Sequence, residues 1–301
     1  MGIDIPSVQL LCCAKRIGVD FSDTMTVGRQ MVFVPPDAIA SILSTIGIPS
    51  EQTSVIVEGQ FAESLFTLLG ARQVSSVDAS NYERATHIHD FNQSLPASLA
   101  NRSSVVHDGG TIEHVFNIPQ AFKNCMEMVR IGGHFIQVTG ANNYMGHGFW
   151  QFCPELIYRI FSRENGFQIK AVLMHEPIAM RPGAGTSFGA WYKVEDPASH
   201  HCRVELINDM PTYICTIAQR VEDRRIFAHF PQQSDYVEAW KLTREQRPES
   251  SIRGGVIRRM IPRSIKKLAL WIRDAAKNKP GSFDRPYYHR ISDDDLVCGR
   301  F

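Results

Sequence analysis

The sequence predicts an α/β protein built on a doubly wound, mostly parallel sheet with helices on both faces. Two observations indicate this fold. From residue 53 onward, short apolar segments alternate with segments of helical periodicity, which is typical of successive β-α units. The strand-like segments also contain continuous apolar runs, as expected for strands that are buried on both sides.

We expect seven strands in a Rossmann-like arrangement. The first five should be parallel, and the last two should form an antiparallel edge. The expected strands are residues 53–59, 73–80, 86–92, 103–110, 134–140, 167–177 and 211–221. The expected helices between them cover 60–70, 113–133 and 154–166, and each ends at a glycine, which suits a helix C-terminus.

Three regions are expected along the chain. Residues 1–50 are interpreted as an N-terminal mixed and helical leader, 51–220 as the sheet domain, and 221–301 as a C-terminal extension. Between 252 and 290 the extension carries eleven Lys or Arg against two Asp, on a helical pattern with one apolar stripe. Three interpretations stay open for this basic amphipathic helix: packing on the core, peripheral docking on an anionic membrane surface, or polyanion binding.

Composition narrows the functional class. The net charge of +1 argues against nucleic acid as a partner of the whole molecule. No run of about 18 apolar residues predicts a membrane span, and no secretion signal is expected at the N-terminus. The seven cysteines form no C-x-x-C pair and are expected to be reduced thiols. We therefore expect a cytoplasmic protein, with the inner membrane surface as the alternative location; whether it forms a homo-oligomer stays open.

Acidic residues end two successive expected strands. Asp78 ends the second strand and Asp90 the third, at the edge where ligands bind in open parallel sheets. A carboxylate accepts hydrogen bonds only, so Asp78 suits the two hydroxyls of a ribose. Asp90 could accept from an adenine amino group, with Phe91 offering an apolar face. Either acid could instead cap a local turn, and we favour ligand contact because the two occur together.

Together with their neighbours, these residues resemble the motifs of a known protein family. Residues 53–175 resemble the class I S-adenosylmethionine-dependent methyltransferases through "VIVEG", "FAESLFTLLGA", "SVDAS", "HDFN", "VVHDGGTIEHV" and "MVRIGGHFIQV". The resemblance implies S-adenosyl-L-methionine as cofactor. It implies cofactor contacts at four strand ends: Glu58, Gly59, Gln60 and Phe61; Asp78, Ala79 and Ser80; Asp90, Phe91 and Asn92; Asp108, Gly109 and Gly110. The sequence departs from the family in its first loop, "EGQFAES", which has a single Gly where the family is glycine-rich.

The segment 139–155 follows the fifth expected strand and is the expected acceptor loop. His147 lies there between two glycines and is the first candidate for a general base, because imidazole titrates near neutral pH. Asn142, Asn143 and Tyr144 are candidate acceptor contacts, and His114 is a second catalytic candidate. A structural turn with a solvent-facing histidine is the alternative. No metal is expected, because the paired imidazoles of the sequence lack a recognisable third ligand.

The sequence thus predicts a methyltransferase, with an oxygen of a small molecule or sugar as the acceptor and a loop histidine as the base. The alternative is a non-catalytic or degenerate binding protein on the same fold. The single glycine of the first loop favours the binding protein, whereas the strand-end acids and the His147 loop favour the enzyme.

Overall fold

The computed structural model describes residues 2–177, 189–200, 203–241, 283 and 285–301. Most of the basic segment 252–290 lies outside these residues, so its expected amphipathic helix is not described. None of the helices in the described ranges is long and apolar enough to cross a bilayer.

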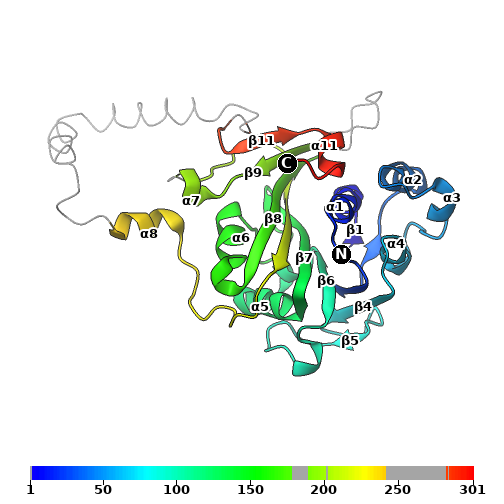
Figure 1. Ribbon diagram of the computed structural model, residues 1–301, viewed down its shortest axis with the longest axis horizontal. Coiled ribbons are helices and arrows are strands. Elements are labelled where there is room, and N and C mark those ends of the chain that lie inside the picture. Colours follow the sequence, from blue (N-terminus) through cyan, green and yellow to red (C-terminus); the bar gives the residue numbers. More distant parts are fainter. Residues whose placement is uncertain (1, 178–188, 201–202, 242–282, 284) are drawn as a thin grey trace.

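A nine-stranded mixed sheet forms the centre of the molecule, where seven strands were expected (Figure 1). Its order is β11-β9-β8-β10-β7-β6-β2-β4-β5. The strands are β2 (Asp23–Val27), β4 (Gln73–Asp78), β5 (His87–Ile88), β6 (Ser103–Gly109), β7 (Val129–Asn142), β8 (Phe167–Glu176), β9 (Ala190–Val194), β10 (Thr212–Arg220) and β11 (Tyr288–Ile291). Five of them, β5-β4-β2-β6-β7, pair in parallel, and the other four extend the sheet by antiparallel pairing.

The strand assignment at 53–59 was wrong, because β2 is the first strand of the parallel set. Within 53–59, Thr53 ends the short helix α3 (Ser50–Thr53), and no strand follows before residue 60. Val55 and Val57 are 55% and 51% exposed, and of this apolar run only Ile56 packs in the core. The pattern missed β2 because its sequence, DTMTV, contains two buried threonines, and the Thr24 hydroxyl donates to the Phe21 carbonyl. Residues 1–50 therefore supply the middle of the sheet.

Helices cover both faces of the sheet (Figure 1). One face carries α1, α2, α3 and α4 with the C-terminal α11, and the other carries α5 and α6. Their bounds are α1 (Ile5–Arg16), α2 (Pro36–Ser44), α4 (Glu63–Leu68), α5 (Ile118–Met128), α6 (Pro154–Ile160) and α11 (Asp293–Val297). The remaining described helices are α7 (Pro197–His200), α8 (Ser234–Lys241) and the 3₁₀ turns η1 (Ala97–Leu99), η2 (Ile112–His114) and η3 (Arg163–Asn165). This three-layer arrangement is the doubly wound fold that the sequence predicted.

The N-terminus is held close to the carboxyl edge of the sheet. β1 (Gly2–Ile3) pairs in parallel with β3 (Met31–Val32), which follows β2 closely in sequence. Asp4 then caps α1, because its Oδ1 accepts from the Ser7 backbone N–H at 3.1 Å and from the Ser7 hydroxyl at 2.6 Å. These contacts place the first turn of α1 beside the ends of the parallel strands.

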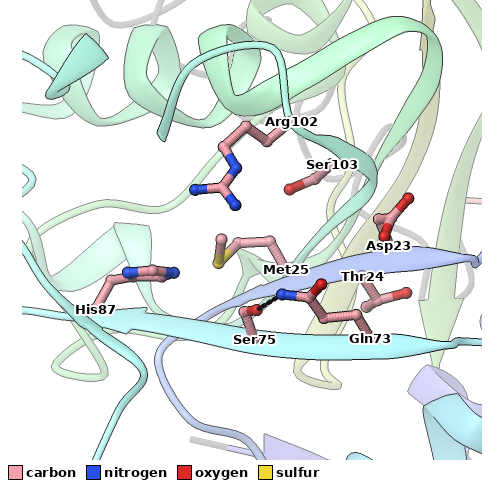
Figure 2. Close-up of a pocket in the computed structure, with 8 residues that line it drawn as sticks. All are labelled: Asp23, Thr24, Met25, Gln73, Ser75, His87, Arg102 and Ser103. Atoms are coloured by element: carbon pink, nitrogen blue, oxygen red, sulfur yellow. Dashed lines mark hydrogen bonds between the residues drawn. The ribbon is translucent and has the colours of Figure 1, made fainter. Parts of the chain in front are cut away.

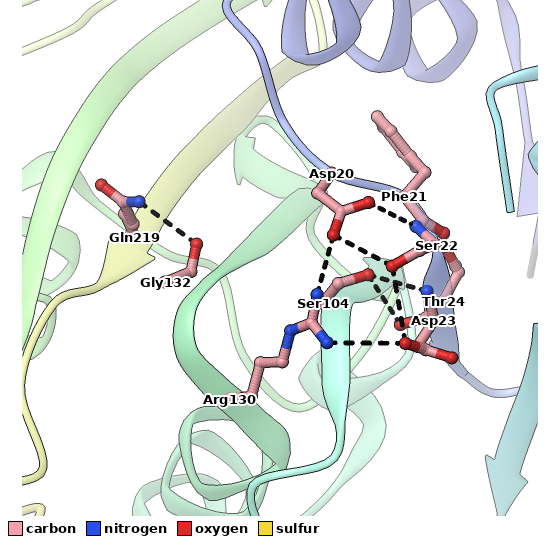
Figure 3. Close-up of polar contacts among 9 residues, drawn as sticks. All are labelled: Asp20, Phe21, Ser22, Asp23, Thr24, Ser104, Arg130, Gly132 and Gln219. Atoms are coloured by element: carbon pink, nitrogen blue, oxygen red, sulfur yellow. Dashed lines mark hydrogen bonds and ion pairs between the residues drawn. The ribbon is translucent and has the colours of Figure 1, made fainter.

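Polar contacts join the strands at the opposite, amino edge (Figure 3). Ser104 at the start of β6 is fully buried; its Oγ accepts from the Asp23 N–H at 2.8 Å and donates to the Asp23 carbonyl at 3.1 Å. Arg130 of β7 forms ion pairs with Asp20 at 2.7 Å and with Asp23 at 3.6 Å. The central position of β2 is thus secured by side chains from β6 and β7.

Replacing Ser104 by alanine should lower the free energy of unfolding by about 1–3 kcal/mol, because the Asp23 N–H and carbonyl would lose their partner. Denaturant titration of wild type and variant measures the difference. Ser98→Ala is the matched control, because Ser98 is exposed and should leave stability nearly unchanged. Equal loss in both variants would contradict the assigned role of Ser104.

Candidate active site

A cavity of about 280 Å³ lies at the carboxyl ends of β6 and β7. In a doubly wound sheet, ligands bind at this edge, near the point where the strand order reverses. Here the reversal falls between β2 and β6. The cavity is lined by Gly2, Asp4, Ser7, Phe33, Gly109, Gly110, Glu113, His114, Val138, Thr139, His147 and Tyr213. Its position and its polar lining make it the candidate active site.

A second cavity, of about 50 Å³, lies toward the amino ends of the strands (Figure 2). Asp23, Gln73 and Ser103, the first residues of β2, β4 and β6, line it together with residues that include His87 and Arg102. It is too small for a nucleoside, and it lies at the wrong edge of the sheet for ligand binding in this fold. We therefore do not assign it a function.

Both sequence-predicted catalytic histidines line the larger cavity. The His114 and His147 rings lie 5.3 Å apart between centroids, and His147 Nε2 lies 3.8 Å from Glu113 Oε1. The loop that carries His147 is attached to η2, because the N–H groups of Phe149 and Trp150 donate to the Glu113 carbonyl at 3.0 and 3.2 Å. The imidazole is 50% exposed, so it can meet a ligand from solvent.

Glu113 is the buried member of this group, and the sequence analysis did not select it. Its side chain is 1% exposed and its Oε2 has no hydrogen-bond partner in the described part of the chain. Burial, together with the nearby Asp108 carboxylate, raises the pKa of Glu113 to about 8. Glu113 can therefore hold a proton near neutral pH, beside the imidazole of His147.

Asp108 lies next to the last residue of β6, below the cavity, and is fully buried. Its Oδ1 accepts from the Thr111 N–H at 2.9 Å, and its Oδ2 accepts from the Gln137 amide at 2.8 Å. Burial raises the pKa of Asp108 to about 6, and these hydrogen bonds oppose the shift. Since both oxygens have protein partners, Asp108 positions the Gly109–Gly110 turn and does not face a ligand. The two glycines border the cavity directly.

The pH dependence of stability should differ between wild type and Glu113→Gln. The unfolded carboxyl loses its proton near its ordinary pKa of 4.5, whereas the folded one keeps it up to about 8. The unfolded state therefore binds fewer protons between these values, so this group makes stability fall as pH rises through that window. Glutamine stays neutral, so the variant should gain stability relative to wild type from about pH 5 to about pH 9.

Thermal melts across this range, recorded with a chelator present, measure the effect. Glu58→Gln is the control, because Glu58 is exposed and its replacement should not alter the pH profile. A Glu113→Gln profile parallel to that of wild type would show that Glu113 titrates at its ordinary pKa.

The first-loop assignment was wrong together with the first strand. Glu58 and Gln60 are exposed, Gly59 donates its N–H to the Val32 carbonyl, and Phe61 packs under the Arg29 guanidinium at 3.8 Å. None of the four borders the cavity. The loop that follows the true first strand is residues 28–30.

This loop also contains one glycine. Gly28 has φ +68° and donates its N–H to the Val77 carbonyl at 2.8 Å, which joins the ends of β2 and β4. The Gln30 amide and the Thr111 hydroxyl both donate to the Val27 carbonyl, at 2.6 and 2.7 Å. The side chains of Gln30 and Thr111 therefore occupy the point of strand reversal. A glycine-rich loop would leave this space free for a ligand.

The structure places Asp78 at the end of β4, as the sequence predicted. Its carboxylate is half-buried and has no hydrogen-bond partner among the described residues, while its carbonyl accepts from the His89 N–H at 2.8 Å. Ala79 and Ser80 follow on the surface, where Ser80 Oγ accepts from the Tyr82 N–H at 3.3 Å. The free carboxylate at a strand end matches the requirement for a diol-binding acid.

The third strand end differs from the expectation. Asp90 is exposed, and its Oδ1 accepts from the Asn92 N–H at 2.9 Å and from the Asn92 side chain at 2.8 Å. These bonds lower the pKa of Asp90. Phe91 is 4% exposed and packs in the core, so it offers no face to a ligand. The alternative that Asp90 stabilises its own turn therefore has direct structural support.

The expected acceptor contacts are largely engaged in the protein. Asn142 donates to Asn208 Oδ1 at 2.7 Å, and Asn143 donates to the Asn208 and Met210 carbonyls at 2.8 and 3.0 Å. These amides hold the 206–210 segment rather than an acceptor. Tyr144 stacks on Tyr213 at 5.2 Å between centroids and touches His147 edge-on at 5.4 Å. Tyr144 thus supports two residues that border the cavity.

Sequence reasoning missed the N-terminal wall of the site. Asp4 and Ser7 come from the start of α1, Phe33 follows β3, and Tyr213 lies in the antiparallel β10. These residues belong to segments that were set apart from the sheet or expected only as an edge. No pattern in the sequence joins them; the parallel pairing of β1 with β3 does so in space.

Strand order defines the type of α/β fold. Five parallel strands in the order 3-2-1-4-5, counted along the chain, are followed by an antiparallel extension. The chain therefore has a doubly wound α/β fold with a mixed sheet. This agrees with the family that the sequence resembles, although the first strand lies 30 residues earlier than expected, at 23 rather than 53.

No protein-family model matches the chain, and no curated protein matches it. Among solved structures, a Thermotoga maritima S-adenosylmethionine-dependent methyltransferase, a possible histamine N-methyltransferase, is 13% identical, with a TM-score of 0.34 over 72% of this chain and 89% of that one. The Thermus thermophilus branched-chain polyamine synthase, bound to 5′-methylthioadenosine, is 12% identical, with a TM-score of 0.36 over 76% and 61%. The methyltransferase domain of the citrinin polyketide synthase has 8% identity and a TM-score of 0.24, over 40% of this chain and 30% of that one. With TM-scores below 0.5, these similarities assign neither a fold family nor an activity to this chain.

Proposed function

We propose that this protein transfers a methyl group from S-adenosyl-L-methionine to an oxygen atom of a small molecule or sugar. The observation that supports this most directly is the cavity at the carboxyl ends of β6 and β7, where Glu113, His114 and His147 meet. It lies at the edge where the doubly wound fold binds ligands, and it contains a group that can accept a proton.

The proposed cofactor contacts run along the same edge. Asp78 accepts hydrogen bonds from the ribose hydroxyls, because its carboxylate is otherwise free. Gly109 and Gly110 border the cavity and leave room for neighbouring side chains: a Cβ at Gly110 would lie 3.2 Å from Glu113 Oε1, and one at Gly109 would lie 2.6 Å from Gln30 Oε1. When bound, S-adenosylmethionine supplies an electrophilic methyl group on a positively charged sulfur.

The proposed acceptor enters beside His147. Nε2 of His147 would take the proton of the acceptor hydroxyl, and S-adenosylmethionine bound along this edge would supply the methyl group. Glu113 beside this nitrogen orients the ring and stabilises the imidazolium when the carboxyl is ionised. Alignment of donor and acceptor in the cavity supplies the rest of the rate enhancement.

A second candidate is a non-catalytic binding protein on the same fold. The loop after β2 favours it, because Gln30 and Thr111 occupy the point of strand reversal with their own hydrogen bonds. In this case a nucleoside would still bind through Asp78, but no methyl group would be transferred.

Calorimetry with S-adenosylhomocysteine tests both candidates, since each requires nucleoside binding. An assay with an isotope-labelled methyl donor and candidate sugars or cell extracts then separates enzyme from binder. No binding at high protein concentration would overturn both. Binding without label transfer in extracts would favour the non-catalytic candidate.

A cytoplasmic location belongs to the same proposal. The six described cysteines are all free thiols, as expected in a reducing compartment. A location at the inner membrane surface would depend on the basic segment 252–290, most of which lies outside the described residues. Whether the protein forms a homo-oligomer stays open.

A further inference from the structure

We propose that Glu113, His114 and His147 form a binding site for one divalent transition-metal ion, with Zn²⁺ as the best-matched species. This goes beyond the proposed methyl transfer and does not depend on it. It also departs from the sequence-based expectation of no metal, which found no third ligand for a pair of imidazoles.

The three side chains come together from two segments of the chain. Glu113 and His114 lie on η2, and His147 lies on the loop after β7. One ligand atom from each residue lies within 4.8 Å of the other two, and the Glu113 Oε1 to His147 Nε2 distance is 3.8 Å. Ligands bound tetrahedrally at about 2.0–2.2 Å from zinc lie roughly 3.3–3.5 Å apart. Rotations of both exposed rings, His114 and His147, would have to close the remaining distances, which are at most 4.8 Å.

The buried carboxylate is an independent indication of a ligand. The Glu113 side chain is only 1% exposed. Its Oε2 atom is inaccessible to solvent and has no hydrogen-bond partner among the described residues. A buried carboxyl without a hydrogen bond is costly unless something compensates it. A cation bound at its other oxygen would provide that compensation.

Packing holds the carboxylate toward the histidines. A Cβ at Gly148 would lie 3.0 Å from the Glu113 carbonyl and 3.2 Å from its Cγ, and Gly110, at φ +85°, would place one 3.2 Å from Oε1. The glycines therefore allow the two segments to close around Glu113. Both histidines are exposed on the cavity side, which leaves a coordination position for water or a ligand.

The donor set selects the class of ion. Two imidazole nitrogens and one carboxylate oxygen suit Zn²⁺ and its transition-metal neighbours, whereas Mg²⁺ and Ca²⁺ prefer oxygen ligands. Because a metal on Nε2 uses the lone pair that the proposed base needs, an occupied site should inhibit methyl transfer from this nitrogen. The metal would then act on the enzyme as an inhibitor.

Titration of the full-length protein with Co²⁺ and with Zn²⁺, each alone and after chelator treatment, tests the site. A Cys153→Ser, Cys298→Ser background removes the two exposed thiols among the described residues, which could bind either ion. We expect one equivalent to bind, seen as visible Co²⁺ absorption and as calorimetric heat. Glu113→Gln, His114→Ala and His147→Ala should each weaken binding by about tenfold or more.

His229→Ala is the matched control, because His229 is an exposed histidine away from the cavity. Its Kd should equal that of the parent. Absence of Co²⁺ and Zn²⁺ uptake, or uptake that the exposed-residue variants His114→Ala and His147→Ala do not weaken, would overturn the site. The metal titration and the S-adenosylhomocysteine calorimetry are separate measurements. If the metal site is wrong, only metal binding is absent; if the proposed function is wrong, S-adenosylhomocysteine binding or methyl transfer is absent.

Discussion

Replacing Asp78 by alanine should weaken S-adenosylhomocysteine binding by about tenfold or more, because charge-assisted hydrogen bonds to the ribose hydroxyls would be lost. The carboxylate lies at the end of β4 and has no partner among the described residues, so its removal should not disturb the fold. Isothermal calorimetry of wild type and variant measures the ratio of dissociation constants, and a thermal melt checks that the variant is folded.

Asp90→Ala is the matched control for this experiment. Asp90 follows the neighbouring strand β5, but its carboxylate is bound to Asn92 in its own turn. We expect the affinity for the nucleoside to change by less than about threefold. Equal affinities of wild type and Asp78→Ala would refute the ribose assignment. If only Asp90→Ala caused a large loss of nucleoside affinity, the ribose contact would be assigned to Asp90 instead of Asp78.

Replacing His147 by alanine should lower the rate of methyl transfer by about a hundredfold or more, since general-base catalysis contributes about 10²–10⁴. The affinity for S-adenosylhomocysteine should stay nearly unchanged, because the imidazole is placed on the acceptor side of the cavity. Turnover with the labelled methyl donor, measured in the presence of a chelator, gives the comparison. The chelator removes any ion that would occupy the same nitrogen.

His229→Ala again serves as the control, and its turnover should equal that of wild type. If His147→Ala retains full turnover, the base lies elsewhere or the acceptor needs none. His114 would then be tested next, because its ring lies 5.3 Å from that of His147 in the same cavity. A loss of cofactor affinity together with turnover would indicate a structural role for the loop.

The later part of the sheet could be predicted from local pattern. The segments 73–80, 103–110, 167–177 and 211–221 contain the observed strands β4, β6, β8 and β10, and 134–140 covers half of β7. These segments contain apolar residues bounded by turn residues, so each has a local strand signal. The first strand does not, because Thr24 and Thr26 are buried polar residues within β2. At 53–57 a strand was predicted where none exists, because most residues of this apolar run face solvent.

Candidate site residues, like the strands, could be selected only where a local sequence pattern indicated them. Asp78 and His147 could be selected because each has a clear place relative to an expected strand. Glu113 looked like an ordinary acid at a helix start, and only its burial beside Asp108 raises its pKa. Asn142 and Asn143 looked available, but their amides hold the 206–210 segment, which lies more than sixty positions later.

The sequence alone determined the class of fold and the chemical types that its strand ends carry. Both depend on residues close together in the chain: apolar runs, glycine-terminated helices, and an acid directly after a strand. Which strand takes the centre of the sheet, and which side chains meet in the cavity, was decided only by tertiary structure. Pairing between distant strands, such as β2 with β6, and burial of individual polar groups depend on contacts that no local pattern contains.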